Sequence, residues 1–456
     1  MVASSFIYEI KLDRFTFLLN GLNGCSDIIQ SSLWEKVKKG KYMNFYKNTI
    51  KDLKDRKFIF EDKNEELKLY NDSSTKLEQR LFQDKRRIIS INISEDCNLS
   101  CPYCISSKRR SQKMLSKAHI DKIVALLNSF EKKYNVIPRI TLFGGEPLML
   151  RNRHIFEYLI KKIEGTKFKL HIITNGVTID KYLDLINENS DKFQFFQITL
   201  DGPPEIHNRT RISKKYPKTF KLITGNIQRL LDLNFKVRVR TNLNKASLEK
   251  LPKLARFIKK KKWDKYKNFR GNMGLISTYQ LKFCKNNPRS NSVKYIKQFR
   301  QLKKKHPELS LYNECDLYTQ ADKLITNSLK DKTNKPMISY CTTINSRHFT
   351  FASDNQIYNC FAAVGIKDFS IGTYFPKLKW NKNNLAIWKT RVSTQMDKCR
   401  KCPLVFVCGG NCPLHAYEKN GNINKPVCAG GIKDLEAFVK LNKDKILKKA
   451  GIYKKR

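Results

Sequence analysis

The sequence predicts an α/β protein built around a partial TIM-like barrel of six strand–helix repeats, (β/α)6. Apolar strand candidates recur from residue 88 to residue 276, with amphipathic helical stretches between them. Strands that alternate with helices in this way indicate βαβ units and a parallel sheet. Six repeats over about 190 residues suit an open barrel better than a closed eightfold one. The expected strands are Ile88–Ile93, Ile140–Phe143, Lys169–Ile173, Phe195–Leu200, Lys236–Arg240 and Asn272–Ile276, and the expected helices are Lys117–Lys133, Arg153–Ile163, Ile179–Asn187, Lys221–Leu233 and Leu248–Lys260.

A small separate unit is expected at residues 1–80, before the barrel. Two short apolar runs with Asn-Gly turns, two helical segments and a further strand at Lys57–Phe60 predict a winged-helix-like domain. The helical segments are Ser32–Lys38 and Tyr46–Leu53, and the polar, acidic stretch Glu61–Glu66 follows the last strand.

The remaining chain divides into four further parts. We expect the barrel at 86–280, a lysine-rich connector with one helix at 281–339, and a cysteine-rich domain at 340–430. Residues 431–456 are expected to form a closing helix and a basic tail. In parallel α/β folds the chemistry gathers in loops at the C-terminal ends of the strands, so we expect the site there.

The composition excludes several classes of protein. With 40% hydrophobic and 11% aromatic residues, the 456-residue chain is not fully disordered. No run approaches the ~20 apolar residues of a spanning helix, and early charged residues leave no signal-peptide core. A net charge of +49 favours a polyanionic or acidic partner, although the lysines are spread along the whole chain. We therefore expect a cytoplasmic protein without a membrane partner, whose 13 cysteines bind metal instead of forming disulfides.

Three cysteines directly follow the first expected barrel strand. Cys97, Cys101 and Cys104 have the spacing C-x3-C-x2-C, and residues 96–113 contain no other cysteine or histidine. Structural zinc needs four protein ligands, whereas a cubane iron–sulfur cluster on three thiolates leaves one iron open to a chelating ligand. The alternatives are packed loop thiols, or zinc with a remote fourth ligand.

A second group of seven cysteines lies in the region 340–430. So many thiolates exceed one zinc-ribbon site, which is the alternative interpretation, and they suit two clusters better. The group consists of Cys341, Cys360, Cys399, Cys402, Cys408, Cys412 and Cys428.

The first triplet resembles the signature of the radical S-adenosylmethionine (SAM) superfamily. Gly144, Gly145, Glu146 and Pro147, which follow the second strand, resemble the glycine–glycine–glutamate–proline motif of that family. The resemblance implies that the triplet holds a [4Fe–4S] cluster that binds SAM at its open iron. It also implies that the backbone and carboxylate of the second motif hold the amino group of SAM.

Two segments at strand ends resemble those of peptide-modifying members of this superfamily: Thr174-Asn175-Gly176 after the third strand, and Leu200-Asp201-Gly202-Pro203 after the fourth, which runs on to Arg211. The resemblance implies cofactor contacts for Tyr103 and Asn175, a carboxylate clamp for Arg211, and a catalytic role for Asp201. His207 is expected to be structural. Arg240 and Asn242 are weaker candidates.

The region 340–430 resembles the SPASM domain, which carries auxiliary clusters behind many radical SAM barrels. The resemblance includes the Cys-Gly-Gly-x-Cys-Pro stretch at Cys408–Pro413. It implies one [4Fe–4S] cluster on Cys399, Cys402, Cys408 and Cys428, and another on Cys341, Cys360 and Cys412. The fourth ligand of the latter is left open between Cys315, Cys284, a non-thiolate side chain, water and the substrate. Phe361 stands where sulfatase-maturing relatives tend to carry an aspartate base.

The joint resemblance implies reductive cleavage of SAM and a 5′-deoxyadenosyl radical that abstracts a substrate hydrogen. An external flavodoxin- or ferredoxin-type protein would supply the electron. Residues 1–80 resemble the leader-recognition domain of ribosomal-peptide maturases, which binds a leader by strand addition. We therefore expect a precursor peptide with a leader as substrate and a C–S, C–C or C–O cross-link as product. Deleting residues 1–80 is expected to abolish leader binding and to leave SAM cleavage intact.

Two alternative functions remain at this point. One is maturation of a whole protein, such as a sulfatase or a quinohemoprotein subunit. The other, less favoured, is a basic RNA-modifying protein, since +49 would suit phosphates although no aromatic-laced basic strip is present.

Overall fold

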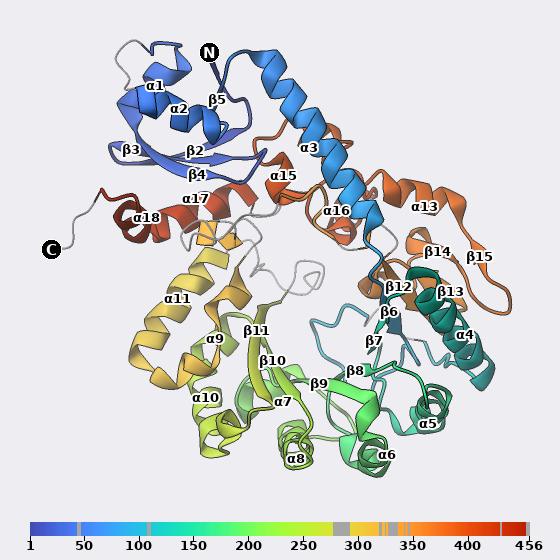
Figure 1. Ribbon diagram of the computed structural model, residues 1–456. Coiled ribbons are helices and arrows are strands. Elements are labelled where there is room, and N and C mark those ends of the chain that lie inside the picture. Colours follow the sequence, from blue (N-terminus) through green and yellow to red (C-terminus); the bar gives the residue numbers. More distant parts are fainter. Residues whose placement is uncertain are drawn as a thin grey trace.

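The computed structural model shows an N-terminal unit, an open barrel and a C-terminal region, which follow one another along the chain (Figure 1). Among the residues that the structure describes, no helix combines the length and the apolar character needed to cross a bilayer. The described residues are 1–42, 47–106, 111–276, 292–318, 322–323, 325–326, 336–341, 343–344, 347–428 and 431–452.

The N-terminal unit is a three-stranded antiparallel sheet with helices packed on it. β2 pairs with β3 and β3 pairs with β4, so β2 and β4 are the sheet edges. Leu18, Trp34 and Val37 are buried in a small core of this unit. Its elements are β1 (Val2–Ala3), β2 (Ile7–Leu12), β3 (Phe15–Asn20), β4 (Ser26–Gln30), α1 (Ser31–Lys38), α2 (Lys47–Asp55), β5 (Ile59–Phe60) and α3 (Lys63–Gln83).

The long helix α3 takes the place of the polar stretch that the sequence suggests after β5. The Asp62 carboxylate accepts hydrogen bonds from the amides of Asn64 (2.8 Å) and Glu65 (2.9 Å), which caps the helix. Acidic residues in the first turn also complement the helix dipole. The acidic run therefore starts a helix that continues beyond residue 80, to Gln83. The pattern also misses β4, where only Ile28 and Ile29 are apolar.

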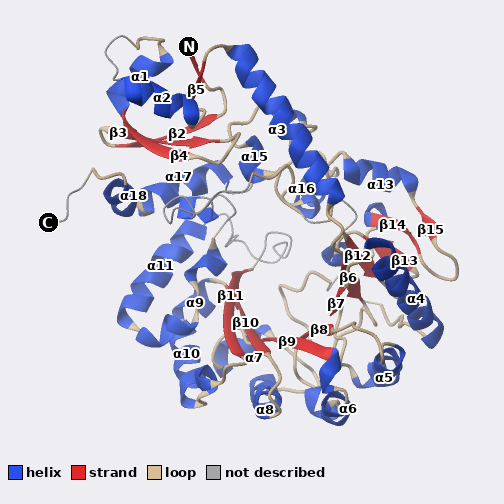
Figure 2. Cartoon of the chain, in the orientation of Figure 1, coloured by secondary structure: helices blue, strands red, loops and turns tan. Residues whose placement is uncertain are grey.

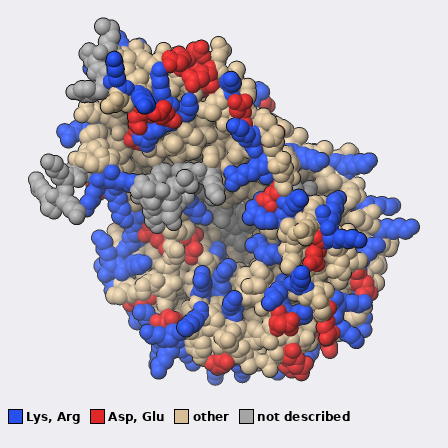
Figure 3. All heavy atoms as spheres, viewed as in Figure 1, with Lys and Arg blue, Asp and Glu red and all other residues tan. Residues whose placement is uncertain are grey.

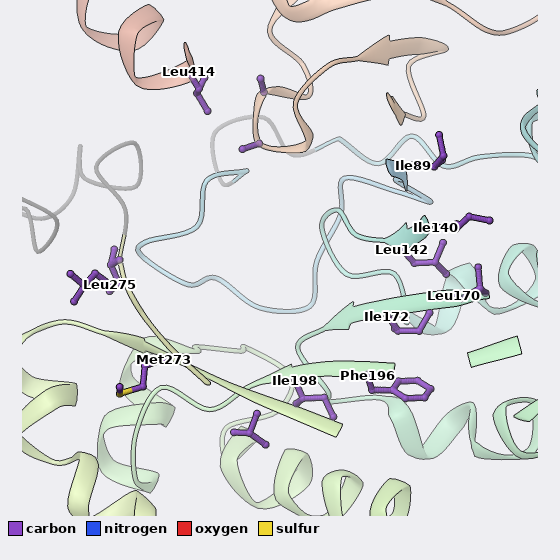
Figure 4. Packing of buried hydrophobic residues seen from close by; sticks show 14 of the residues in the cluster. Ile89, Ile140, Leu142, Leu170, Ile172, Phe196, Ile198, Met273, Leu275 and Leu414 are labelled. Atoms are coloured by element: carbon purple, nitrogen blue, oxygen red, sulfur yellow. The ribbon is translucent and has the colours of Figure 1, made fainter. Parts of the chain in front are cut away.

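Six parallel strands form the open barrel in chain order, and helices cover its outer side (Figure 2). All six overlap the strands expected from the sequence, and the fold class is as predicted. Most of their apolar residues are buried, and several, such as Ile140 and Ile172, are fully so. Figure 4 shows several of these side chains along neighbouring strands. The strands are β6 (Ile88–Ile91), β7 (Arg139–Leu142), β8 (Leu170–Thr174), β9 (Phe193–Thr199), β10 (Val237–Leu243) and β11 (Phe269–Leu275).

The barrel helices follow the expected positions, with one addition. The short helix α7 was not among the predicted elements, and it carries His207 behind the fourth strand. The helices are α4 (Lys117–Tyr134), α5 (Arg153–Lys162), α6 (Leu183–Glu188), α7 (Pro204–Thr210), α8 (Thr219–Asp232), α9 (Lys245–Glu249) and α10 (Leu251–Lys260).

The C-terminal region continues the barrel sheet instead of forming a separate one. Strand β12 pairs in parallel with β6, and β13, β14 and β15 follow in antiparallel order, which makes one ten-stranded sheet. The elements are β12 (His348–Phe351), β13 (Gln356–Tyr358), β14 (Ser370–Thr373), β15 (Lys379–Trp380), α13 (Lys382–Lys389), α14 (Asp397–Arg400), α15 (Val405–Cys408), α16 (Pro413–Asn420), α17 (Gly431–Leu441) and α18 (Lys443–Lys449).

The described part of the expected connector is packed into the fold. Helix α11 (Ser292–Lys305) buries Ile296 and Phe299 completely. The closing segment is two helices, α17 and α18, because Asn442 interrupts it. The Asn442 side chain donates to the Phe438 carbonyl (2.7 Å) and accepts from Arg300 Nη2 (2.9 Å), so it joins this segment to α11.

The N-terminal unit packs directly on the C-terminal region. A Cβ atom at Gly21 would lie 1.7 Å from the Pro403 carbonyl oxygen, so only glycine allows this approach. The Phe406 amide donates to the Gly21 carbonyl (3.2 Å), and the Phe406 ring stacks on Tyr70 with centroids 5.5 Å apart. The turn after β3 and helix α3 are thus both fixed against the cysteine-rich segment.

The basic surplus lies outside the N-terminal unit. Residues 1–80 contain 15 Lys and Arg against 12 Asp and Glu, whereas the whole chain has 90 against 41. Figure 3 shows Lys and Arg side chains spread over the visible face of the barrel and the C-terminal region, with Asp and Glu among them. Charge alone therefore does not single out the N-terminal unit as the basic partner of an acidic peptide.

Candidate functional site

The three cysteines of the first motif lie in one loop at the C-terminal end of β6. Cys101 is buried, and Cys97 and Cys104 are half-buried. The Cys104 amide donates to the Cys101 carbonyl (3.1 Å), and the Ser100 amide donates to the Ile212 carbonyl (2.7 Å). The loop is therefore held both by its own backbone and by the segment after β9.

The glycine motif after β7 interlocks with the segment that leads into Cys97. The Gly145 amide donates to the Ser94 carbonyl (3.1 Å), and the Glu146 amide donates to the Asp96 carbonyl (2.8 Å). A Cβ atom at Gly145 would lie 2.0 Å from the Asp96 carbonyl oxygen, and one at Gly144 would lie 1.8 Å from Asn92 Oδ1. Both glycines are thus required for close contact between the two loops. Pro147 is buried behind them.

The Glu146 carboxylate lies inside the protein and joins β7 to β8. It is 1% exposed and accepts hydrogen bonds from Thr174 Oγ1 (2.5 Å), the Asn175 amide (2.7 Å) and the Leu148 amide (3.0 Å). Burial raises its pKa, and these three donors oppose the increase. The carboxylate is occupied by protein donors, and it positions the loop after β8.

Asn175 connects that loop to the first cysteine. Its Nδ2 donates to Asn98 Oδ1 (2.7 Å) and lies 3.8 Å from Cys97 Sγ, while its Oδ1 accepts from the Val177 amide (2.9 Å). The Leu99 amide also donates to Cys97 Sγ (3.4 Å). Asn98 is a site residue that the sequence did not single out, because an asparagine between cysteines carries no signal by itself.

Tyr103, Asp201 and Arg211 form a buried network between the cysteine loop and the loop after β9. The Tyr103 hydroxyl donates to Asp201 Oδ2 and accepts from Arg211 Nη1 (3.0 Å). Arg211 Nη1 lies 3.9 Å from Asp201 Oδ2, and the Asn242 amide donates to Asp201 Oδ1 (3.2 Å). The structure thus brings together the predicted catalytic residue and two predicted cofactor residues.

Burial and mutual charges shift the pKa values of the residues in this network. Burial raises the pKa of Asp201, and the Arg211 charge opposes the increase. Burial likewise raises the pKa of Tyr103 well above its usual value, with the Asp201 charge adding to it. Arg211 Nε is buried and has no hydrogen-bond acceptor within the described part of the chain. His207 Nδ1 accepts from the Asp201 amide (3.3 Å), which supports its structural role.

Arg240 and Asn242, the weaker candidates, lie on β10 and contact each other. Arg240 Nη1 donates to Asn272 Oδ1 (2.7 Å) and Nε to Asn242 Oδ1 (3.3 Å). A Cβ atom at Gly274 would lie 1.6 Å from Arg240 Nη2, so this glycine makes room for the guanidinium.

The seven C-terminal cysteines fall into two spatial sets. Burial and then the charges of Cys341 and Cys412 raise the pKa of Cys360, which places these three together. Burial and then Cys408 and Cys428 raise the pKa of Cys399 to about 12, with a contribution from Cys402. We call Cys399, Cys402, Cys408 and Cys428 the first auxiliary set, and Cys341, Cys360 and Cys412 the second auxiliary set.

Hydrogen bonds to sulfur occur in both sets. Thr343 Oγ1 donates to Cys341 Sγ (3.1 Å), and the Leu404 amide donates to Cys402 Sγ (3.4 Å). Cys315 follows Asn313, whose side chain accepts from the Cys315 amide (3.0 Å). Cys25 lies in the N-terminal unit, and Cys284 lies outside the described residues. Across the described ranges, no three His, Cys, Asp or Glu side chains converge as the ligands of a single metal ion.

Comparison with known proteins places this geometry in a family. Residues 91–258 match the radical SAM superfamily. These residues form a radical SAM domain. This superfamily uses a [4Fe–4S] cluster and SAM. The loop at Cys97–Cys104 and its surroundings are where these cofactors would bind.

Relatives of the radical SAM enzyme share either part of the sequence or the whole fold. The cysteine-type anaerobic sulfatase-maturating enzyme of Clostridium novyi (strain NT) is 26% identical over 181 residues, 37% of this chain and 46% of that protein, so the chain spans about half of that relative. Native anSMEcpe with bound AdoMet has a TM-score of 0.58 and 18% identity, over 80% of this chain and 100% of that one. Streptococcus suis SuiB bound to precursor peptide SuiA has a TM-score of 0.55 and 17% identity, over 94% of this chain and 99% of that one.

The residues of the radical SAM enzyme fit the cofactors of its family. Three thiols in one loop, with N–H donors aimed at Cys97 Sγ, suit a cluster whose properties depend on hydrogen bonds to sulfur. The orphaned Nε of Arg211 suits a carboxylate such as that of SAM. The buried Glu146 carboxylate suits a positioning role in this site, through the loop that carries Asn175.

Proposed function

We propose that this radical SAM enzyme matures a ribosomally made precursor peptide and installs a C–S, C–C or C–O cross-link. The observation that carries the proposal is the extent of the likeness to a peptide-bound fold. The likeness to SuiB bound to precursor peptide SuiA covers 94% of this chain, against 80% for native anSMEcpe. A fold that accommodates a precursor peptide therefore accounts for nearly the whole chain.

In this proposal the barrel loops hold the cofactors. Cys97, Cys101 and Cys104 would hold the cluster, and Arg211 Nε would bind the SAM carboxylate. When bound, SAM and the cluster supply the radical that abstracts a substrate hydrogen. Asp201 fixes Tyr103 and Arg211 through its buried oxygens, so the three residues act together to keep the loop in place and water out.

The two auxiliary sets would hold two further [4Fe–4S] clusters. Their thiols are grouped by position and are free of disulfide bonds in the described chain. The clusters would take up the electron left on the substrate after hydrogen abstraction. An external flavodoxin- or ferredoxin-type protein would supply the electron that starts each turnover.

A contact between two aromatic side chains joins the loop of the glycine motif to the residue after Cys360. Phe361 directly follows Cys360, and its ring is 39% exposed. It meets Phe143, the residue before Gly144, edge-on with ring centroids 4.9 Å apart. A phenylalanine cannot accept a proton, so this position lacks the base expected of a sulfatase maturase. The absence of a base at this position supports peptide cross-linking. The second candidate function is maturation of a whole protein, and it is favoured by the likeness to the sulfatase-maturating enzyme of Clostridium novyi.

A leader would add as a strand to the edge of the N-terminal sheet. Burial and then the charge of Glu436 on α17 raise the pKa of Tyr8 on β2, so α17 lies close to that edge. Strand β4 is the other edge of this sheet, and it pairs only with β3 among the described strands. We therefore assign leader binding to β4, where the Ile28 amide donates to Asp27 Oδ1 (2.7 Å).

Point substitutions on β4 test this assignment better than deletion of residues 1–80. The contact between Gly21 and Pro403 means that deletion would also uncover the segment around Cys402. Ile28→Pro removes one amide donor from the edge, and Ile28→Ala keeps it. We expect the full-chain proline variant to lose affinity for the precursor at least tenfold in a binding titration, with the alanine variant near wild type. Equal affinities for the two variants would reject β4 as the leader site.

Mass spectrometry of the precursor tests the reaction itself. The enzyme is reconstituted without oxygen with iron and sulfide, then incubated with a candidate precursor peptide, SAM and reductant. A product lighter by one pair of hydrogen atoms per event supports a cross-link. Loss of a larger fragment, or modification only of a folded sulfatase, would contradict the proposal.

A further inference from the structure

One arginine in the C-terminal region is enclosed completely by the protein. Arg391 follows α13, and its side chain is 0% exposed. Burying a guanidinium costs several kcal/mol unless hydrogen bonds and a counter-charge compensate for the lost hydration. Such a residue requires an explanation in terms of its neighbours.

The hydrogen bonds of Arg391 hold the segment between the two auxiliary sets. Its Nη2 donates to the carbonyls of Gly410 (2.6 Å) and Asn411 (3.2 Å). These residues join Cys408 of the first auxiliary set to Cys412 of the second. A Cβ atom at Gly410 would lie 2.6 Å from Arg391 Nη1, so glycine is needed for the backbone to approach the guanidinium.

A second segment also contacts the same side chain. Arg391 Nη1 lies 2.8 Å from the thioether sulfur of Met396, three positions before Cys399. The guanidinium therefore contacts the chain just before Cys399 and again between Cys408 and Cys412.

The electrostatic partners of Arg391 are cysteines of the auxiliary sets, which carry a negative charge only as thiolates. None of the ion pairs formed by the described residues includes Arg391. Burial lowers its pKa, and the charges of Cys399, Cys412, Cys341 and Cys408 oppose that decrease. Two of these cysteines belong to each auxiliary set, so the cation lies within electrostatic reach of both.

We propose that Arg391 is a positioning residue and the shared counter-ion of the two auxiliary cluster sites, and that it raises the reduction potentials of both clusters. The inference rests on the proposed auxiliary clusters. A fixed positive charge in a dry interior stabilises the more negative, reduced cluster over the oxidised one. The same charge favours binding of thiolates over thiols, so it also favours cluster retention.

Redox titration of the reconstituted, full-length enzyme tests the proposal. The variants are Arg391→Gln, which removes the charge, and Arg391→Lys, which keeps it. We expect Arg391→Gln to raise the ratio of oxidised to reduced auxiliary cluster at least tenfold at a fixed potential, about 59 mV for a one-electron couple. The cluster at Cys97–Cys104 is the internal reference, and its midpoint should not move. Electron paramagnetic resonance separates the signals.

Arg400→Gln is the matched control. Arg400 lies next to Cys399 in sequence, but its side chain is 53% exposed and pairs with Asp397. Removing this solvated charge should leave all midpoints near those of the wild type, because water and salt screen it.

Iron content distinguishes the remaining outcomes. If Arg391→Gln loses auxiliary iron while Arg391→Lys retains it, the charge is required and the proposal holds. If both variants lose it equally, or if Arg391→Gln keeps full iron with unchanged midpoints, the proposal is overturned. Wild-type enzyme that binds iron only at Cys97–Cys104 would overturn the auxiliary clusters of the proposed function, and this inference with them.

Discussion

The barrel loop takes its three thiols from eight consecutive residues, whereas the C-terminal region gathers seven thiols from positions as distant as Cys341 and Cys428. Their surroundings differ as well. Buried carboxylates, those of Glu146 and Asp201, hold the loops around the first site. A buried cation, Arg391, lies between the auxiliary sets, whereas the buried cation of the first site, Arg211, faces the Asp201 carboxylate. The thiols of the first site come from one short segment, whose position is fixed by hydrogen bonds to neighbouring loops. The thiols of the auxiliary sites come together only when distant segments of the chain pack against one another.

The largest expected effect comes from removing the local motif. Replacing Cys97, Cys101 and Cys104 by alanine should abolish SAM cleavage and remove about one third of the bound iron, because one of three [4Fe–4S] clusters is lost. Product analysis and iron determination measure the two effects. The auxiliary signals should remain, and any residual 5′-deoxyadenosine formation would refute the role of the triplet.

Removing the Asp201 carboxylate, which holds the loops of the first site, should have the next largest effect. Asp201→Ala leaves Arg211 buried beside Tyr103 without its counter-charge, which should lower the free energy of unfolding by about 3–5 kcal/mol. Anaerobic denaturant unfolding measures this. Asp397→Ala is the control, since that side chain is 93% exposed, its partner Arg400 is 53% exposed, and its loss should change stability by about 0.5 kcal/mol or less. Similar losses in both variants would mean that the buried network does not lock the loop.

The dependence of the auxiliary sites on packing is tested at Gly21. Gly21→Val forces its side chain into the Pro403 carbonyl and should cost about 1–3 kcal/mol by overpacking. Iron should be lost from the first auxiliary set before the barrel cluster, as followed by electron paramagnetic resonance during heating. Gly225→Ala is the control, because its nearest neighbour is the flexible end of Arg229 at 3.7 Å. Simultaneous loss of all clusters would contradict the expected order.

The smallest effect is expected at a single hydrogen bond. Thr343→Val removes the hydroxyl that donates to Cys341 Sγ and should cost about 0.5–1.5 kcal/mol. Because hydrogen bonds to sulfur raise cluster potentials, only the second auxiliary set should shift to a lower midpoint. A shift of the first set by the same amount would show that the two sets do not respond separately.

Local pattern was enough to predict the barrel and its loops. Buried parallel strands read as apolar runs, so β6 to β11 were found, and the spacing of Cys97, Cys101 and Cys104 marked the first site. Glu146 and Asp201 were found in the loops after the strands, and so were their partners Asn175, Arg211 and Asn242. Asn98 was missed, because an asparagine between cysteines carries no signal of its own.

Long-range contacts account for what the sequence did not reveal. Arg391 is one of 90 lysines and arginines, and nothing near it in sequence marks it as buried. The contact of Gly21 with Pro403 joins residues far apart in the chain, as does the pairing of β12 with β6. Such contacts depend on the folded topology, which single-residue propensities do not encode.

Strand β6, which leads into the first cysteine loop, has a neighbour on each side, β7 within the barrel and β12 from the C-terminal region. A fragment that ends before residue 340 would leave one margin of this strand with bare amides and carbonyls, a ready template for other chains. The barrel would then be prone to aggregate when expressed without the C-terminal region. The barrel and the C-terminal region should therefore be expressed and engineered as one folding unit.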